Sequence, residues 1–158
     1  MKNKIILLIL CMVCLFSLTS CGQQNSTTSN DNKPSIKYVD IYDVVKEAFV
    51  TNNGYTNELS KHMTEEVFKR INYNKYNEND PKYKKPLKVD FSLREVYQTK
   101  DNENNLVYVD MIHSIKITDA NNKIVSGSWD AGITFTVKIA ENEWYIIEDR
   151  QYADGRLR

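Results

Sequence analysis

Thiol groups are scarce in this chain of 158 residues, which contains three cysteines. Cys11, Cys14 and Cys21 all lie near the amino end, so the sequence after Cys21 has no cysteine. This excludes a disulfide framework and a cysteine-based metal site from that part of the chain. The two histidines, His62 and His113, lack the paired spacing of zinc ligands, and we expect neither a metal nor another cofactor.

An excess of charge of either sign is also missing. The chain has 21 basic and 21 acidic residues, and removal of a leader with Lys2 and Lys4 would leave 19 basic residues against 21 acidic ones. A nucleic-acid binder normally carries a basic excess or a basic stripe, so we expect no nucleic-acid partner. The sequence has no glycine-rich phosphate loop and no nucleophile elbow, and it therefore specifies no reaction.

Long apolar runs are limited to one segment at the amino end. Lys2 and Lys4 precede about 14 mostly apolar residues, 5–18, which are too few for a comfortable transmembrane helix. Small residues and Cys21 follow, as they do at the cleavage site of a secretory signal. We therefore predict a signal peptide over residues 1–20, with Cys21 as the first residue after cleavage.

The tetrapeptide Leu18-Thr19-Ser20-Cys21 resembles the lipobox of bacterial lipoproteins. This resemblance implies that Cys21 carries diacylglycerol and palmitate, and that the lipid holds the protein on the extracytoplasmic side of the cell membrane. The alternatives are a plain secretory signal cleaved elsewhere and an uncleaved membrane anchor. Two or more acyl chains suffice for stable anchoring, because each buried methylene contributes about 0.8 kcal/mol.

The segment after Cys21 is polar and rich in Ser, Thr, Asn and Gln. It cannot bury enough apolar surface to order itself, so we expect residues 21–34 to form a flexible tether. A chain of the remaining length forms one domain, which we place at residues 35–152. Residues 153–158 are expected to be a frayed tail.

Helical periodicity dominates the first half of the domain. Apolar spacing predicts an amphipathic helix over residues 35–50, which the Asn- and Gly-containing segment 51–54 ends. A capped turn over residues 56–62 and a second helical piece over residues 64–73 follow. A turn-rich link over residues 72–86 closes this half.

The period changes to strict alternation after Pro86. It predicts four strands near residues 89–95, 107–118, 124–139 and 144–149, joined by short polar turns. Gly127 and Gly132 interrupt the third strand and indicate a bulge or a sharp bend. The predicted fold class is α+β, with N-terminal helices packed on a curved four-stranded antiparallel meander.

This order of elements, with a hairpin from Ile133-Thr134-Phe135-Thr136-Val137-Lys138 to Glu143-Trp144-Tyr145-Ile146-Ile147, resembles the nuclear-transport-factor-like (cystatin-like) superfamily. The resemblance covers roughly residues 35–152 and implies a cone-like domain with a concave site. Many members insert a strand pair among the helices, and this chain has none. Its order is closer to lipoprotein members and to extracytoplasmic domains of conjugation and secretion assembly proteins.

His113 is the most informative polar residue, because it falls on the apolar face of its strand between Met111 and Ile115. Glu95 continues the inward face of the first strand, so Glu95 and His113 could form an acid/base dyad. The alternative is a core histidine that is satisfied by a backbone carbonyl or sits at the core rim.

Four apolar or aromatic residues are candidates to line a ligand pocket: Trp129, Met111, Phe91 and Trp144. Aromatic residues at strand alternation are also typical of a core. Asp110 and Asp130 fall on the polar faces of their strands, and we expect both to be solvated.

Three hypotheses about function remain. The first is a non-enzymatic domain that binds an envelope protein, a peptide or a small molecule. The second is an enzyme of the isomerase or dehydratase type seen in the resembled superfamily, using His113 and Glu95. The third is an accessory part of a conjugation or secretion apparatus. The absence of a catalytic constellation favours the first.

Overall fold

The computed structural model describes residues 38–76, 81–141 and 143–152. The predicted signal peptide, lipidation site Cys21, tether and frayed tail all lie outside the described residues. Helices come first and strands follow: α2 (Tyr42–Val50), α3 (Asn57–Ser60), α4 (Glu65–Ile71), the 3₁₀ turn η1 (Tyr73–Tyr76), β1 (Lys88–Asp101), β2 (Leu106–Thr118), β3 (Ile124–Ala140) and β4 (Glu143–Tyr152). The predicted α+β order is confirmed.

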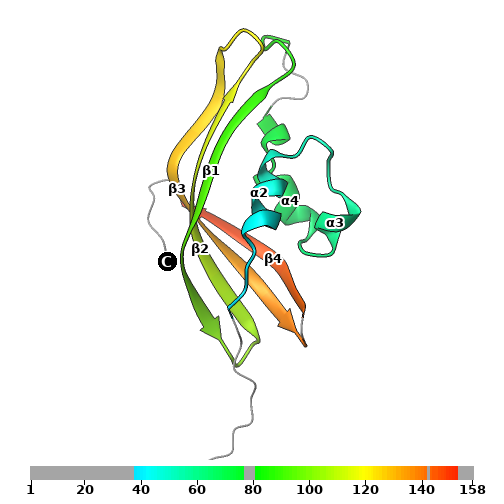
Figure 1. Cartoon of the computed structure of the whole chain (residues 1–158), viewed down its shortest axis with the longest axis vertical. Coiled ribbons are helices and arrows are strands. Elements are labelled where there is room, and N and C mark those ends of the chain that lie inside the picture. Colours follow the sequence, from blue (N-terminus) through cyan, green and yellow to red (C-terminus); the bar gives the residue numbers. More distant parts are fainter. Residues whose placement is uncertain (1–37, 77–80, 142, 153–158) are drawn as a thin grey trace, which may run out of the picture. The chain divides into compact units, whose positions relative to one another are not determined.

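The strands form one open sheet in the order β1-β2-β3-β4, and each strand is antiparallel to its neighbours (Figure 1). The predicted meander is therefore confirmed. Its second turn is fastened by Asp119, whose carboxylate accepts the backbone N–H groups of Asn121 at 2.9 Å and Lys123 at 2.8 Å. Such self-closing turns let consecutive strands pair directly.

Threonine hydroxyls begin the two shorter helices. The Thr56 side chain accepts the N–H of Leu59 at 3.3 Å, and the Thr64 side chain accepts the N–H of Val67 at 3.2 Å. Each bond satisfies a backbone donor that has no partner within the first helical turn. Both helix starts are as predicted from the sequence.

The helix predicted over residues 35–50 is shorter in the structure. Helix α2 begins at Tyr42, and residues 38–41 are not helical. The Gln98 side chain of β1 bonds the backbone of Val39 on both sides, with Gln98 Nε2 2.6 Å from the Val39 carbonyl and the Val39 N–H 3.2 Å from Gln98 Oε1. The predicted start of the helix was wrong because a side chain of β1 makes the hydrogen bonds to the Val39 backbone that a helix would have made internally.

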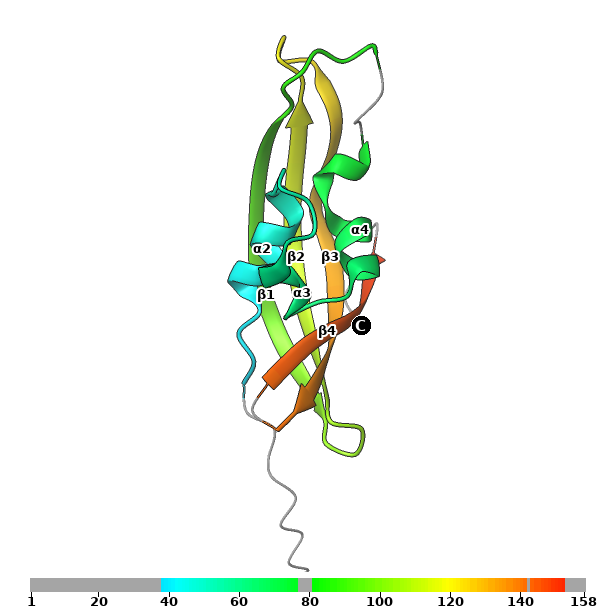
Figure 2. The same cartoon turned by 90° about the vertical axis from the view of Figure 1, so that its right-hand side faces the viewer.

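The described helices lie on one side of the sheet, as Figures 1 and 2 show from two directions. Phe49 of α2 stacks on Phe91 of β1 with 4.7 Å between ring centroids. The loop before α4 joins the edge of β4, since the Thr64 N–H bonds the Ile146 carbonyl and the Ile146 N–H bonds the His62 carbonyl. The core therefore lies between helices and sheet, and its fully buried members include Ile41, Val45, Leu59, Met63, Val67, Ile71, Val107, Met111, Ile117, Ile133, Phe135 and Ile146.

Four irregularities interrupt the sheet register. One lies between Glu95 and Tyr97 of β1, two lie opposite His113 to Ile115 and Ile117 to Thr118 of β2, and one lies opposite Thr136 to Val137 of β3. Each places one extra residue in a strand, and an extra residue reverses which face the following side chains occupy. The predicted bulge in β3 is thus confirmed, and it lies at 129–130, between the two glycines.

Among the described helices, none combines the length and the apolar composition that crossing a bilayer requires.

Candidate functional site

The face of the sheet that the helices cover carries His113, which is 5% exposed. Its ring centroid lies 5.0 Å from that of Phe49, and within the described part of the chain its Nδ1 has no hydrogen-bond partner. Burial and the charge of Lys75 lower the pKa of His113, while a hydrogen bond with the Ala131 backbone acts in the opposite direction. The environment therefore favours the neutral imidazole.

Glu95 lies on the same face of the sheet, yet its carboxylate is held by other groups. The Tyr38 hydroxyl donates to Glu95 Oε2 at 2.9 Å, and Gln98 Nε2 lies 3.3 Å from each carboxylate oxygen. The hydrogen bonds found among the described residues do not join Glu95 to His113. The acid/base dyad stays a prediction that this geometry does not favour.

Three of the predicted pocket residues belong to the packing between helices and sheet. Met111 is 0% exposed in the core. Phe91 is partly buried and stacks on Phe49, and Trp144 is partly buried with its ring 4.6 Å from that of His62. Their exposed surface for a ligand is therefore small or nil.

Trp129, the fourth predicted pocket residue, lies on the opposite face of the sheet, away from the core. The bulge at Trp129 and Asp130 changes the register of β3 from His113↔Ala131 to Ile115↔Ser128. Trp129 is 65% exposed, and its indole covers Gly127, where a Cβ would come within 2.7 Å of the ring. Simple alternation fails here because the extra residue in β3 exchanges the two faces of the sheet for the side chains that precede it in the strand.

The face of the sheet turned away from the helices carries two cross-strand rows of polar and aromatic side chains. The strand register aligns Tyr97, Asp110, Thr134 and Arg150 in one row, and Thr99, Tyr108, Thr136 and Glu148 in the next. We call these eight residues the outer rows. Each row takes one side chain from each of the four strands, so residues distant in sequence are brought side by side.

Asp110 is the centre of the first row. It is 2% exposed, which corrects the expectation that it is solvated. The Thr134 hydroxyl donates to its carboxylate, and Asp110 also bonds the Tyr97 hydroxyl. Partial desolvation and the charge and hydrogen bond of Asp110 raise the pKa of Tyr97. Neighbouring strands thus bury a carboxylate that alternation alone places in water.

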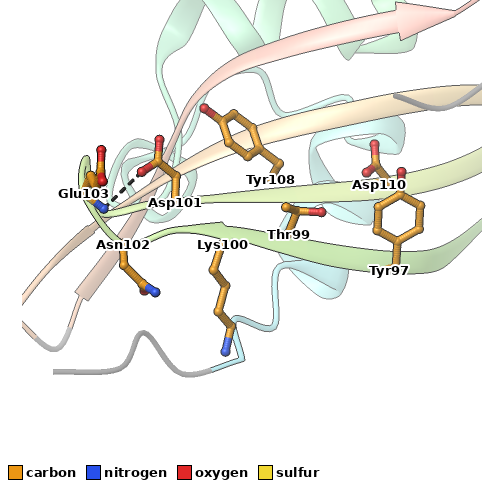
Figure 3. Close-up of a pocket in the computed structure, with 8 residues that line it drawn as sticks. All are labelled: Tyr97, Thr99, Lys100, Asp101, Asn102, Glu103, Tyr108 and Asp110. Carbon is orange, nitrogen blue, oxygen red and sulfur yellow. Dashed lines mark hydrogen bonds between the residues drawn. The ribbon is translucent and has the colours of Figure 1, made fainter. Parts of the chain in front are cut away.

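Two hollows lie on either side of Tyr108, which lines both. The larger, of about 760 Å³, extends from Tyr97 and Asp110 to the turn at Asp101 and Glu103. In Figure 3 the Tyr97 hydroxyl points to the Asp110 carboxylate, whereas Lys100 extends to the opposite face of the sheet from Tyr108. The larger hollow is therefore walled by carboxylates and tyrosine rings.

The smaller hollow, of about 270 Å³, lies over β3 and β4 between Tyr108 and Tyr152. The Arg150 guanidinium lies 5.7 Å from the centre of the Tyr152 ring. The Tyr152 hydroxyl is buried and has no hydrogen-bond partner among the described residues. A buried hydroxyl without a partner is a group that a bound molecule could satisfy.

The outer rows can recognise a ligand by hydrogen bonds and ring contacts, since they combine hydroxyls, carboxylates, one guanidinium and tyrosine faces. Groups of three or more His, Cys, Asp or Glu side chains able to hold a metal ion do not occur in the described ranges.

Sequence reasoning missed the outer rows. Their tyrosines and threonines alternate with core residues along β2 and β3, which the sequence shows as ordinary solvent-facing positions. With the hairpin register known, the pairing of Tyr108 with Thr136 and of Asp110 with Thr134 would have revealed them. That register depends on the bulges, which the sequence does not locate to the residue.

Comparison of the chain with protein-family models, with curated protein sequences and with solved structures finds no match.

Proposed function

We propose that this chain is a lipid-anchored extracytoplasmic lipoprotein whose folded domain binds a ligand or partner at the cell envelope without catalysing a reaction. The observation that carries the binding role is the contrast between the two faces of the sheet. One face is filled by the core, with Met111, Ile133 and Phe135 at 0% exposure, and the other holds the outer rows and their hollows. Concave polar and aromatic surfaces are the usual places where small ligands bind.

The anchor rests on the sequence Leu18-Thr19-Ser20-Cys21 and on the basic and apolar residues before it. Cys21 has no later cysteine in this sequence to pair with, so a disulfide within the domain does not compete with lipidation. The polar segment of residues 21–34 supplies a tether of about 20 Å root-mean-square reach between lipid and domain.

The fold proposed for the domain is the cone-like arrangement of the nuclear-transport-factor-like superfamily. Its support is the helices-first order and the closing hairpin of β3 and β4. The bend of the sheet, visible in Figure 1, is in keeping with it.

The experiment that tests the anchor is the substitution Cys21→Ala with radiolabelled palmitate in the producing cell. The wild-type chain should incorporate the label and fractionate with membranes. Cys21→Ala should lose the label completely, because no other thiol follows the cleavage site. Incorporation is the decisive readout, since an uncleaved precursor could stay in the membrane by its apolar segment.

The matched control is Cys14→Ala, which removes a cysteine inside the signal and should leave labelling unchanged. Label that persists in Cys21→Ala, or that is lost in Cys14→Ala alone, would show that the lipid site lies elsewhere or that the chain is not a lipoprotein.

The enzyme hypothesis requires an open pocket with Glu95 and His113 inside. His113 packs against Phe49, and Glu95 is bonded to Tyr38 and Gln98. The accessory role in conjugation or secretion has no described contact or surface of its own that favours it over simple binding.

A further inference from the structure

The outer rows point to a particular class of ligand. We infer that they bind a neutral oligosaccharide, laid across the strands over Tyr108. This inference deepens the proposed binding function and rests on it.

The charges of the two hollows, taken together, disfavour a strongly anionic ligand. Their lining contains four acidic residues, Asp101, Glu103, Asp110 and Glu148, and two basic ones, Lys100 and Arg150. Lys100 extends to the opposite face of the sheet in Figure 3, which makes the larger hollow more negative. A phosphate or carboxylate group placed there would face like charges, which weaken its binding.

The same lining suits hydroxyl-rich neutral molecules. Carboxylates accept two or more hydrogen bonds each, and the guanidinium of Arg150 donates several. Asp110 is buried and holds the Thr134 and Tyr97 hydroxyls in place, so these two side chains lose little freedom when a ligand binds beside them. The buried Tyr152 hydroxyl, which lacks a partner among the described residues, supplies a further group for a sugar hydroxyl.

The tyrosine rings supply the apolar half of the recognition. A pyranose ring has C–H groups on its faces and hydroxyls at its edge, so it packs flat on an aromatic ring while its edge bonds polar neighbours. Tyr97, Tyr108 and Tyr152 stand in and beside the outer rows on three strands, with Tyr108 shared by both hollows. Two adjacent hollows divided by one ring fit consecutive sugar units better than a single compact ligand.

A cationic ligand fits less well. Arg150 lines the smaller hollow and would repel an ammonium group there, and its guanidinium lies over the Tyr152 ring, the face that a cation would seek. The test therefore includes a basic peptide as the competing class.

The experiment titrates the full chain, purified in a sugar-free zwitterionic detergent, with an N-acetylglucosamine tetramer, maltotetraose and tetralysine by isothermal titration calorimetry. We expect saturable binding of at least one tetrasaccharide. Tyr108→Ala and Arg150→Ala should each weaken it tenfold or more, and circular dichroism should show that both variants stay folded. If one of them unfolds, the other decides the result, because Arg150 is an exposed side chain.

The matched control is Trp129→Ala. Trp129 is an exposed aromatic residue on the same side of the sheet but outside both hollows, so its loss should change the affinity less than twofold. Binding that is lost in Trp129→Ala and kept in Tyr108→Ala and Arg150→Ala would overturn the placement of the site. Binding of tetralysine alone, or of none of the three probes, would overturn the ligand class.

The palmitate experiment separates this inference from the proposed function. If Cys21 is labelled and no saccharide binds, the lipoprotein proposal stands and only the ligand class is wrong. If a tetrasaccharide binds and Cys21 is not labelled, the site is correct and the anchor is not.

Discussion

At the scale of single residues, the decisive positions are two polar groups that strands bury, and Asp110 is the one that the sequence did not lead us to expect. Asp110 lies on the face of β2 turned away from the core, yet it is only 2% exposed because Thr134 and Tyr97 cover it. His113 sits on the core face and is enclosed by aromatic rings. The environment of each side chain is set by residues of other elements, and the sequence around it in β2 does not reveal these contacts.

His113 makes the stability of the domain dependent on acid pH. Its pKa is lowered in the folded state, so below the ordinary histidine pKa of about 6.5 the unfolded chain binds a proton that the folded one resists. The stability that the neutral His113 contributes is fully present above pH 6.5 and is lost as the pH falls through the lowered pKa of His113. His113→Phe should therefore show a smaller loss in the free energy of unfolding between pH 7.5 and pH 5, measured by urea denaturation.

The control for this prediction is His62→Gln, which leaves His113 in place and should keep the acid-dependent loss that His113 causes. An equal loss in His113→Phe and in the wild-type chain would mean that His113 is not buried in the folded protein.

At the scale of elements, the bulge in β3 is the feature that organises the outer surface. Asp130 has a φ of +47°, and its N–H donates to the Ser114 hydroxyl at 2.9 Å. This conformation costs about 1–2 kcal/mol for most L-residues, and less for Asp, Asn and Gly. The local side-chain bond and the choice of Asp together make one extra residue tolerable in the strand.

Asp130→Val should lower the free energy of unfolding by about 1–2 kcal/mol, because a β-branched side chain resists a positive φ. Asp130→Gly should equal or exceed the wild-type stability. Chemical denaturation at neutral pH measures both. Asp90→Val is the matched control, since Asp90 is exposed within β1 and has no positive φ, and it should be neutral or slightly stabilising. Equal effects of Val at both positions would contradict the bulge.

At the scale of the whole domain, the helices and the sheet are joined through the Met63 carbonyl. The Tyr55 hydroxyl donates to it, and the Tyr145 hydroxyl of β4 donates to it at 2.7 Å. The same loop is bridged to Ile146 by backbone bonds. One carbonyl therefore ties the segment before α3, the loop before α4 and the edge strand β4.

This joint should weaken at alkaline pH. Burial, and after it the hydrogen bond and charge of Tyr145, raise the pKa of Tyr55 from 10.0 to about 12. The stability that its neutral hydroxyl supplies is fully present below pH 10 and is lost as the pH rises towards about 12. Tyr55→Phe should lower stability at pH 7.5 by about 1 kcal/mol and should reduce the alkaline loss, as thermal unfolding at pH 8 to 11.5 would measure.

Tyr83→Phe leaves the Tyr55 hydroxyl in place and is the control, so it should keep the alkaline loss that Tyr55 causes. If Tyr55→Phe unfolds with the same alkaline dependence as the wild-type chain, Tyr55 does not hold this joint.

The order of elements was predictable because it depends on short-range patterns. Alternation of Val107, Val109 and Met111 marks a half-buried strand wherever it occurs, and Thr64 before Val67 marks a helix start. The start of α2 was not predictable in the same way. The bonds that keep Val39 out of the helix come from Gln98, a residue far along the chain.

The sequence by itself determined the α+β class, the meander and the turns, because each rests on interactions between residues close in the chain. It also carries the whole case for lipidation at Cys21, which lies outside the described residues. Only the tertiary structure decided that Trp129 faces outward, that Asp110 is buried, and that Tyr97, Asp110, Thr134 and Arg150 form one row. The physical reason is the register of the sheet. One extra residue in a strand exchanges its faces, and pairing between strands alone fixes where that residue lies.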